Sequence, residues 1–312
     1  MIEIFKSDQH GKLIKIDNII SGCWINMINP SKSDIEFVQS KTNVETEFFE
    51  AALDDEESSR IDIENNDTLL IFDIPFVEED HDGSIYDTYP LGIIYTDLAL
   101  ITVSLRETYI IKDFISNKIP SFFTYKKFRF ILQILYRIAS YYLLYLRQIE
   151  KKSIFLEKKL NKSMKNEGLI KLHSLEKSLI YFSTSLKSNQ IILDKLLKLE
   201  QIQRYEDDKE LLEDVIIENK QAIEMTDIYT EIISSTMEYF SSFISNNFNS
   251  VAKTLTSVAT VLTIFSVVAS TFGMNVILPF QNSQHAFLIV MGGTSLIVGL
   301  ILFLLYKKNM LV

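Results

Sequence analysis

One face of an apolar helix near the C-terminal end of the sequence carries the residues best suited to chemistry. Steps of three and four residues place small or weakly polar side chains, and one bulky apolar residue, Leu255, on this single helical face. Its members are Asn249, Ala252, Leu255, Ala259, Thr263, Ser266, Ser270 and Gly273. Hydroxyl and amide oxygens accept hydrogen bonds without carrying charge, so such a face could line a water-filled pore. The same pattern is typical of an interface between closely packed helices, and the stripe alone does not decide between the two.

The helix that carries this face lies in a charge-free stretch long enough to cross a membrane twice. No Asp, Glu, Lys or Arg occurs between Lys253 and Lys307. Pro279 divides this stretch. We predict one span over about 251–273 and a second over 286–306, each near the roughly 20 residues that cross a bilayer.

Basic residues around the two spans predict their orientation. Lys253, Lys307 and Lys308 form a basic collar, whereas the connecting loop, 276–285, contains no Lys or Arg. The positive-inside rule then puts both termini in the cytoplasm and the loop outside the cell. The N-terminal residues are charged, so no signal peptide is expected there. The sequence predicts a multi-pass protein of the cell (plasma or inner) membrane, with a basic cytosolic tail at 307–312.

Most of the chain precedes the two spans and predicts a cytosolic part. Residues 1–120 alternate short β-prone runs (IEIF, LIKI, GCWINM, TLLIFDIPF, LGIIYT and LALITVSL) with helical ones over 31–58, which indicates an α/β domain. Residues 121–205 form a helical, coiled-coil-like region, and 206–275 a long stalk helix that continues into the first span. The apolar seam of the helical region comprises Leu172, Leu175, Leu179, Phe182, Leu186, Asn189, Leu193 and Leu196, which we interpret as core.

Composition and motifs argue against enzymatic chemistry. The chain carries 41 acidic and 31 basic residues, a net charge of −10, and most of its carboxylates are expected on a solvated surface. Its single Cys23 excludes an internal disulfide, and its four His residues show no zinc-ligand spacing. No P-loop or nucleophile elbow is present. We therefore predict no catalytic residues, no organic cofactor and no nucleic-acid partner.

A pore lined by one helix per chain requires several chains. Two membrane helices cannot enclose a channel, so the first helices of several copies would surround a common axis, with the second helices outside. The functional interpretation of the face therefore predicts a homo-oligomer.

Several motifs together resemble the CorA family of magnesium channels, within the superfamily of metal ion transporters that carries a Gly-Met-Asn motif. Gly273-Met274-Asn275 ends the first span, and an Asn, a Lys and a Leu at 249, 253 and 255 resemble the family's entry to that helix. WINMINP at 24–30, the segment Ala52–Pro75 and LALITVSLRE at 98–107 are similar to the family's N-terminal motifs. The loop 276–285 departs from the pattern of many relatives because it has no acidic residue.

The resemblance implies a CorA-like fold and a homopentamer in membrane lipid that conducts Mg²⁺ inward passively, driven by the membrane potential, with Co²⁺ and Ni²⁺ as further cargo. Gly273, Met274 and Asn275 would form the selectivity filter, in which a ring of Asn275 amide oxygens binds the still-hydrated ion. Gly273 would allow a tight turn, and Met274 would pack beneath the Asn. The face described above would line the pore, and Ala252 and Leu255 would form its apolar gate.

The resemblance also implies regulatory sites for divalent metal ions between cytosolic domains. Glu78, Glu79 and Asp80 follow the IFDIP motif, where relatives place an acidic residue at the boundary between protomers, and Asp214 and Glu238 fall on acidic positions of the long helix. Mg²⁺ bound between facing carboxylates would relieve their repulsion and stabilise a closed state.

Two alternatives remain open. A ZntB-like zinc transporter of the same superfamily would share the architecture, although that branch has GVN where this chain has Gly273-Met274-Asn275. A non-conducting, membrane-anchored sensor or interaction protein would require neither the hydroxylated face nor Asn249 and Asn275.

Overall fold

The structure is a computed structural model. It describes residues 1–80, 83–120, 122–163, 166–198, 205–275, 279 and 284–307, except for the side chains of residues 79, 80, 83, 84 and 163. The chain divides into two compact units, Met1–Met237 and Glu238–Val312. The finer domain limits given above remain predictions.

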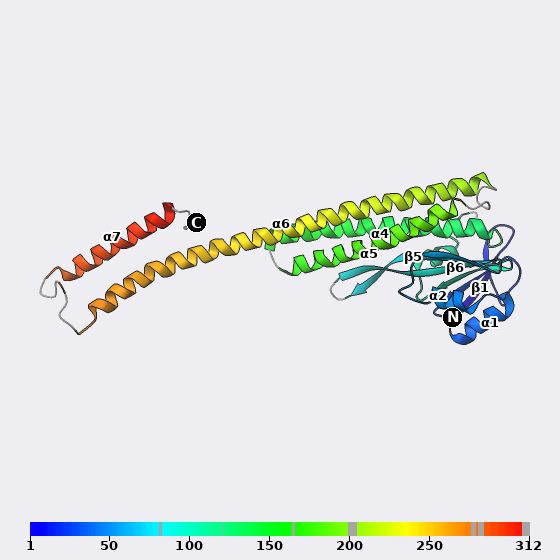
Figure 1. Cartoon of the computed structure of the whole chain (residues 1–312), viewed down its shortest axis with the longest axis horizontal. Helices are drawn as coiled ribbons and strands as arrows, with labels where there is room; N and C mark the ends of the chain where they lie inside the picture. Colours follow the sequence, from blue (N-terminus) through cyan, green and yellow to red (C-terminus); the bar gives the residue numbers. More distant parts are fainter. Residues whose placement is uncertain are drawn as a thin grey trace. The chain divides into compact units, whose positions relative to one another are not determined.

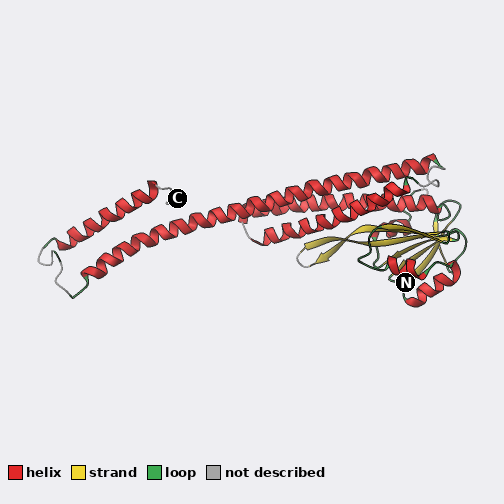
Figure 2. Cartoon of the chain, viewed as in Figure 1, coloured by secondary structure: helices red, strands yellow, loops and turns green. Residues whose placement is uncertain are grey.

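Among the described residues, the first unit holds the strands and helices α1 to α5 (Figure 1, Figure 2). Its elements are β1 (Ile2–Ser7), β2 (Leu13–Ile16), β3 (Cys23–Ile28), α1 (Lys32–Thr42), α2 (Thr46–Ala52), β4 (Arg60–Glu64), β5 (Asp67–Asp80), β6 (Gly83–Tyr95), β7 (Ala99–Ser104), α3 (Tyr109–Ile115), α4 (Lys127–Ser163) and α5 (Asn166–Leu196). Helix α6 (Glu206–Phe272) begins in the first unit and ends in the second, which also holds α7 (Ala286–Lys307).

The strands form one mixed sheet in the order β2-β1-β3-β7-β6-β5-β4. Only β3 and β7 pair in parallel among the described strands, with Cys23 opposite Ala99 and Ile28 opposite Ser104. A parallel pair requires a crossover connection, and the chain between β3 and β7 supplies it as α1, α2 and the strands β4 to β6.

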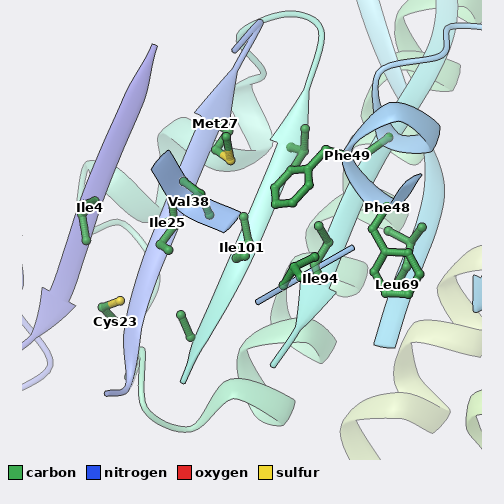
Figure 3. Close-up of a cluster of buried hydrophobic side chains, with 14 of the residues drawn as sticks. Ile4, Cys23, Ile25, Met27, Val38, Phe48, Phe49, Leu69, Ile94 and Ile101 are labelled. Carbon is green, nitrogen blue, oxygen red and sulfur yellow. The ribbon is translucent and has the colours of Figure 1, made fainter. Parts of the chain in front are cut away.

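Side chains alternate between the two faces of the sheet and build a core on each. Cys23, Ile25 and Met27 of β3 pack with Val38 of α1 and Phe49 of α2 (Figure 3). Between them in sequence, Trp24 points to the opposite face, is fully buried, and has its ring centroid 5.1 Å from that of Phe130 in α4. The sheet is therefore covered by helices on both faces, which is the α/β domain that the sequence predicted.

The apolar seam of α5 is confirmed as core, because all eight of its predicted positions are buried. The helices predicted within 31–58 are also present as α1 and α2. Helix α1 starts at a capping box in which Ser31 and Asp34 each accept a hydrogen bond from the other's backbone N–H.

Three features of the first unit were not predicted. Strand β4 is joined to β5 by Asn65 and Asn66, both with positive φ, as a two-residue hairpin turn requires. Helix α3 is anchored by the buried Asp113, whose carboxylate accepts hydrogen bonds from Arg137 and Tyr141 of α4. Strands β5 and β6 extend beyond the predicted runs into one long hairpin.

Asn189 is the polar member of the α5 seam, and it completes the hydrogen bonding of β5. Strand β4 begins at Arg60, which pairs with Ile71, so the backbone of Asp73 lies outside the stretch of β5 that pairs with β4. The Asn189 amide takes the place of a strand there: its oxygen accepts from the Asp73 N–H (3.0 Å) and its nitrogen donates to the Asp73 carbonyl (2.8 Å). Burial raises the pKa of the Asp73 carboxyl, while hydrogen bonds from Ser185 and Ser59 act in the opposite direction.

Replacing Asn189 with Leu should destabilise the first unit by about 1–3 kcal/mol, because the Asp73 N–H and carbonyl each lose one of two partners and keep only Ser59 Oγ (3.3 Å) and the Tyr142 hydroxyl (3.0 Å). The apparent melting temperature of the detergent-solubilised protein, followed by the fluorescence of Trp24, measures the loss. Asn161→Leu, at an exposed position of α4, is the matched control. Equal melting temperatures for the two variants would contradict this role of Asn189.

Gly92 of β6 marks the closest approach of helix α2 to the sheet. A Cβ at this position would lie 2.3 Å from the Cβ of Ala52, well inside van der Waals contact. We expect Gly92→Ala to cost about 1–3 kcal/mol through overpacking, measured by the same melting assay. The double variant with Ala52→Gly should recover part of that loss, whereas additive losses would show that the two sites do not touch.

Candidate functional site

The candidate site lies in the second unit, where two helices are long and apolar enough to cross a membrane. These are α6, through its C-terminal part, and α7. Within this unit the end of α6 and the start of α7 border a common apolar groove, lined by Phe265, Val268, Ala269, Phe272, Ala286, Phe287, Val290, Met291 and Thr294. The α6 residues of this groove define the side of the helix that faces α7.

The predicted pore face lies on roughly the opposite side of α6, given about 100° of rotation per residue. It is exposed at Asn249, Leu255, Ala259, Thr263, Ser266, Ser270 and Gly273, and half-buried at Ala252. A shallow groove on this side is lined by Leu262, Thr263, Ser266, Val267, Ser270, Thr271 and Met274. In a single chain this face therefore has no helix packed against it among the described residues.

Hydrogen bonds within the helix fix what the hydroxyls of this face offer to a ligand. Thr263 Oγ1 donates to the Ala259 carbonyl at 2.8 Å, and Thr271 Oγ1 donates to Val267 at the same distance. With its proton used in the helix, each hydroxyl oxygen presents lone pairs outward and acts as an acceptor. Water bound to a cation donates its protons outward, so these oxygens match the outer surface of a hydrated cation.

Helix α6 ends just before the Gly-Met-Asn motif. The Gly273 N–H donates to the carbonyls of Ala269 and Ser270, at 3.0 and 3.2 Å. Gly273 does not have a positive φ, and a Cβ there would meet only ordinary contacts. The conformation of the single chain therefore does not require glycine at this position, unlike the tight turn that was expected. Met274 is 56% exposed in the single chain, so its packing beneath Asn275 stays a prediction. Asn275 is also exposed.

At the other end of the apolar segment, Leu255 is 69% exposed and follows the half-buried Ala252 by three residues on the same face. Lys253 and Lys307 are exposed at the ends of their helices' apolar segments, and Lys308 lies outside the described residues. An apolar ring built from several copies of Leu255 is the arrangement at which a pore can dewet.

Among the described side chains of one chain, the predicted regulatory carboxylates do not belong to any group of three or more that could hold a metal ion. Glu78 on β5 lies 3.7 Å from Arg106, and Asp214 and Glu238 are exposed on α6. The side chains of Glu79 and Asp80 are not among those that the structure describes. Within the described residues, no group of three or more His, Cys, Asp or Glu side chains could hold a metal ion.

The face also has members that the sequence pattern did not assign. Leu262 and Val267 border the groove beside the hydroxyls, and Thr271 joins it next to Ser270. The alternating steps of three and four residues select a narrow line, whereas a side chain adjacent to that line still reaches the same groove. Among these three residues, only Thr271 could have been assigned to the groove from the sequence, because it carries a hydroxyl like its neighbours on the face.

Comparisons with known proteins give relatives that match nearly the whole chain. A family model described as CorA-like Mg²⁺ transporter protein matches residues 21–307. The cobalt/magnesium transport protein CorA of Methanocaldococcus jannaschii is 27% identical over 288 residues, covering 91% of this chain and 88% of that protein.

Two solved structures are similar in fold. The complete structure of the CorA magnesium transporter from M. jannaschii matches with a TM-score of 0.81 at 24% identity, over 98% of each chain. The cytoplasmic domain of ZntB from Vibrio parahaemolyticus matches with a TM-score of 0.59 at 15% identity, covering 78% of this chain and 96% of that one.

Proposed function

Because this chain belongs to the family of CorA-like Mg²⁺ transporter proteins, we propose that it forms a homopentameric channel for passive uptake of Mg²⁺. Co²⁺ and Ni²⁺ are further cargo in this proposal, and no organic cofactor takes part. The protein would lie in the plasma or inner membrane with both termini in the cytoplasm, as the positions of Lys253 and Lys307 favour.

The uncharged acceptor face of α6 is the observation that carries this proposal. Mg²⁺ gives up its water reluctantly and is commonly bound with several waters in place. Hydroxyl oxygens such as that of Thr263, and the amide of Asn275, can accept hydrogen bonds from those waters without removing them. Carboxylates would hold a divalent ion more tightly and slow its release, and none occurs in this segment.

The exposure of this face supports an oligomer in which five copies of α6 surround the pore. The face points away from the side that meets α7, so α7 would occupy the outer, lipid-facing ring. Gly292, Gly293 and Gly299 of α7 have no atom within 4 Å of an added Cβ, which leaves room for close helix packing in the assembly.

No nucleotide is needed to drive uptake in this proposal. A divalent cation that crosses an inside-negative membrane gains about 4.6 kcal/mol per 100 mV, twice the value for a single charge. The membrane potential alone therefore favours inward movement, and the protein has only to lower the barrier and control its opening.

Gating would combine an apolar constriction with metal binding between cytosolic domains. Ala252 and Leu255 would form the constriction, with Asn249 at its cytosolic mouth. Intracellular Mg²⁺ would bind between protomers through Glu78, Glu79, Asp80, Asp214 and Glu238.

Flux into reconstituted liposomes tests the proposed function. Vesicles that contain a Mg²⁺-sensitive dye should show influx above that of protein-free vesicles, and an inside-negative potential should increase it. Zinc influx without magnesium influx would favour a ZntB-like transporter instead. No flux of any divalent cation would favour a membrane-anchored protein that does not conduct.

A further inference from the structure

Glu78 of β5, one of the proposed regulatory carboxylates, lies beside an arginine to which the proposed function gives no role. Arg106 follows β7 in the chain, and its Nη1 lies 3.7 Å from Glu78 Oε2. Both residues belong to the first unit, in which β5 and β7 are strands of one sheet. The cation therefore reaches this carboxylate from within the same chain.

A stack of aromatic rings sets the position of Arg106. Its guanidinium carbon lies 5.2 Å from the centre of the Phe76 ring, and Phe76 precedes Glu78 by two residues, on the same face of β5. The Phe76 ring packs edge-on against Tyr89 of β6, which is buried, with their centroids 5.2 Å apart. Because a cation is attracted to a ring face, the guanidinium is held beside the carboxylate by a contact other than the ion pair itself.

The ion pair between Arg106 and Glu78 contributes little to the stability of the fold. Both side chains are exposed, at 60% and 66%, and exposed pairs of this kind are weak. An exposed arginine can also turn into solvent without disturbing the core. The main effect of Arg106 is therefore on what else can bind to Glu78.

The space beside this pair suits a hydrated Mg²⁺ ion. Glu78 and Arg106 line a cavity of about 180 Å³, which Glu107 and Thr108 also border. One water occupies about 30 Å³ in the liquid, so the cavity has room for an ion with several of its waters. Mg²⁺ is usually bound through one or two carboxylates while it keeps several waters, and the oxygens of this cavity match that requirement.

Both carboxylates of this cavity lie next to cations of the same chain. Arg106 lies beside Glu78, and Lys112 Nζ lies 2.9 Å from Glu107 Oε2. A neighbouring cation repels an arriving divalent ion, so it weakens the binding of that ion to the carboxylate. Of these two cations, Arg106 is the one that adjoins a proposed regulatory carboxylate.

We propose that Arg106 competes with intracellular Mg²⁺ for Glu78 and thereby sets the Mg²⁺ concentration at which uptake is inhibited. Mg²⁺ binds when Arg106 leaves the carboxylate and turns into solvent, and the contact with Phe76 opposes that movement. The arginine thus raises the concentration of Mg²⁺ that the site requires. This inference rests on the proposed regulatory role of Glu78, but not on the identity of the ion that the pore conducts.

The first test measures metal binding without transport. A ligand that binds the folded protein raises its melting temperature, so melting of the full-length protein in detergent at graded Mg²⁺ concentrations gives the half-effective concentration. The part of this stabilisation that Glu78→Gln removes belongs to the site. The same variants in liposomes loaded with graded Mg²⁺ give the concentration for half-inhibition of influx.

Arg106→Gln should lower both half-effective Mg²⁺ concentrations about threefold to tenfold. A unit charge about 5 Å from a divalent ion in water changes its binding by roughly tenfold, and screening by salt reduces this effect. Arg106→Lys keeps the charge and should stay closer to the wild type. In a Glu78→Gln background, Arg106→Gln should have no further effect on the Mg²⁺ dependence, because it acts through Glu78.

Arg60→Gln is the matched control. Arg60 is also exposed and paired, with Glu57 at 3.0 Å and Asp62 at 2.7 Å. It lies opposite Ile71, seven residues before Glu78 along β5, which is about 23 Å and more than twice the screening length at 0.1 M salt. Its replacement should leave both Mg²⁺ concentrations unchanged.

The outcomes separate this inference from the proposed regulatory site. Unchanged Mg²⁺ concentrations in Arg106→Gln, while Glu78→Gln still removes the stabilisation, would overturn the role of Arg106 and leave the site in place. An equal shift in Arg60→Gln would also overturn it, because the effect would then be one of overall charge. No effect of Glu78→Gln would remove both Glu78 as a regulatory ligand and this inference, whereas the proposed channel would still be tested by flux.

Discussion

Asn275→Ala should reduce Mg²⁺ influx into liposomes by at least about tenfold. The exposed amide follows the end of α6, and in the proposed pentamer five copies would face one hydrated ion. Each lost hydrogen bond between an amide oxygen and a coordinated water removes about 1 kcal/mol, and two such losses already exceed a tenfold change. The initial rate of dye response at a fixed inside-negative potential measures the effect.

A second variant at Asn275 and a control variant at Asn161 make this test more specific. Asn275→Asp keeps acceptor oxygens but adds charge, so it should still bind Mg²⁺ while releasing it more slowly. Asn161→Ala, at an exposed position of α4, should conduct normally. Influx at the wild-type rate in Asn275→Ala would remove Asn275 from the proposed filter.

Asp214→Ala should leave uptake active at internal Mg²⁺ concentrations that close the wild-type channel. Asp214 is exposed on α6, and its proposed partner is a carboxylate of a neighbouring copy. Without it, Mg²⁺ loses a ligand in the closed state, and a loss of about 1.4 kcal/mol per site would already shift half-inhibition about tenfold. Liposomes loaded with graded Mg²⁺ concentrations give the inhibition curve.

The neighbouring Glu213 supplies the matched control. It is also exposed on α6, but it points about 100° away from Asp214 and lies 3.8 Å from Lys209. Glu213→Ala removes the same charge and should leave inhibition unchanged. An identical shift in both variants would indicate a general effect of surface charge, and no shift in Asp214→Ala would exclude it as a regulatory ligand.

The sequence was sufficient to predict the elements whose periodicity runs over many residues. The α5 seam from Leu172 to Leu196 and the charge-free spans each repeat one signal often enough to define a helix and its buried or apolar side. The family resemblance is likewise confirmed, because the Gly-Met-Asn motif lies within a match that extends from residue 21 to residue 307.

Short elements with mixed composition escaped prediction for physical reasons. Strand β4, RIDIE, is mostly polar because it lies at the sheet edge, and its best signal was the Asn65-Asn66 turn that follows it. Asn189 was included in an apolar seam because its spacing fits the seam, although its amide serves the backbone of β5. The filter and the regulatory carboxylates are proposed to function between chains, and periodicity within one chain does not position residues across such an interface.

The bond between Asn189 and Asp73 has a consequence for the order of events during synthesis. These residues are 116 positions apart, so β5 leaves the ribosome with an open edge long before α5 exists to cover it. An uncovered edge is a template for pairing with strands of other chains, and Pro75, which has no N–H to donate, weakens that template two residues further along. Until α5 docks, the nascent first unit is therefore exposed to aggregation, and its protection depends on a helix made shortly before the membrane segments.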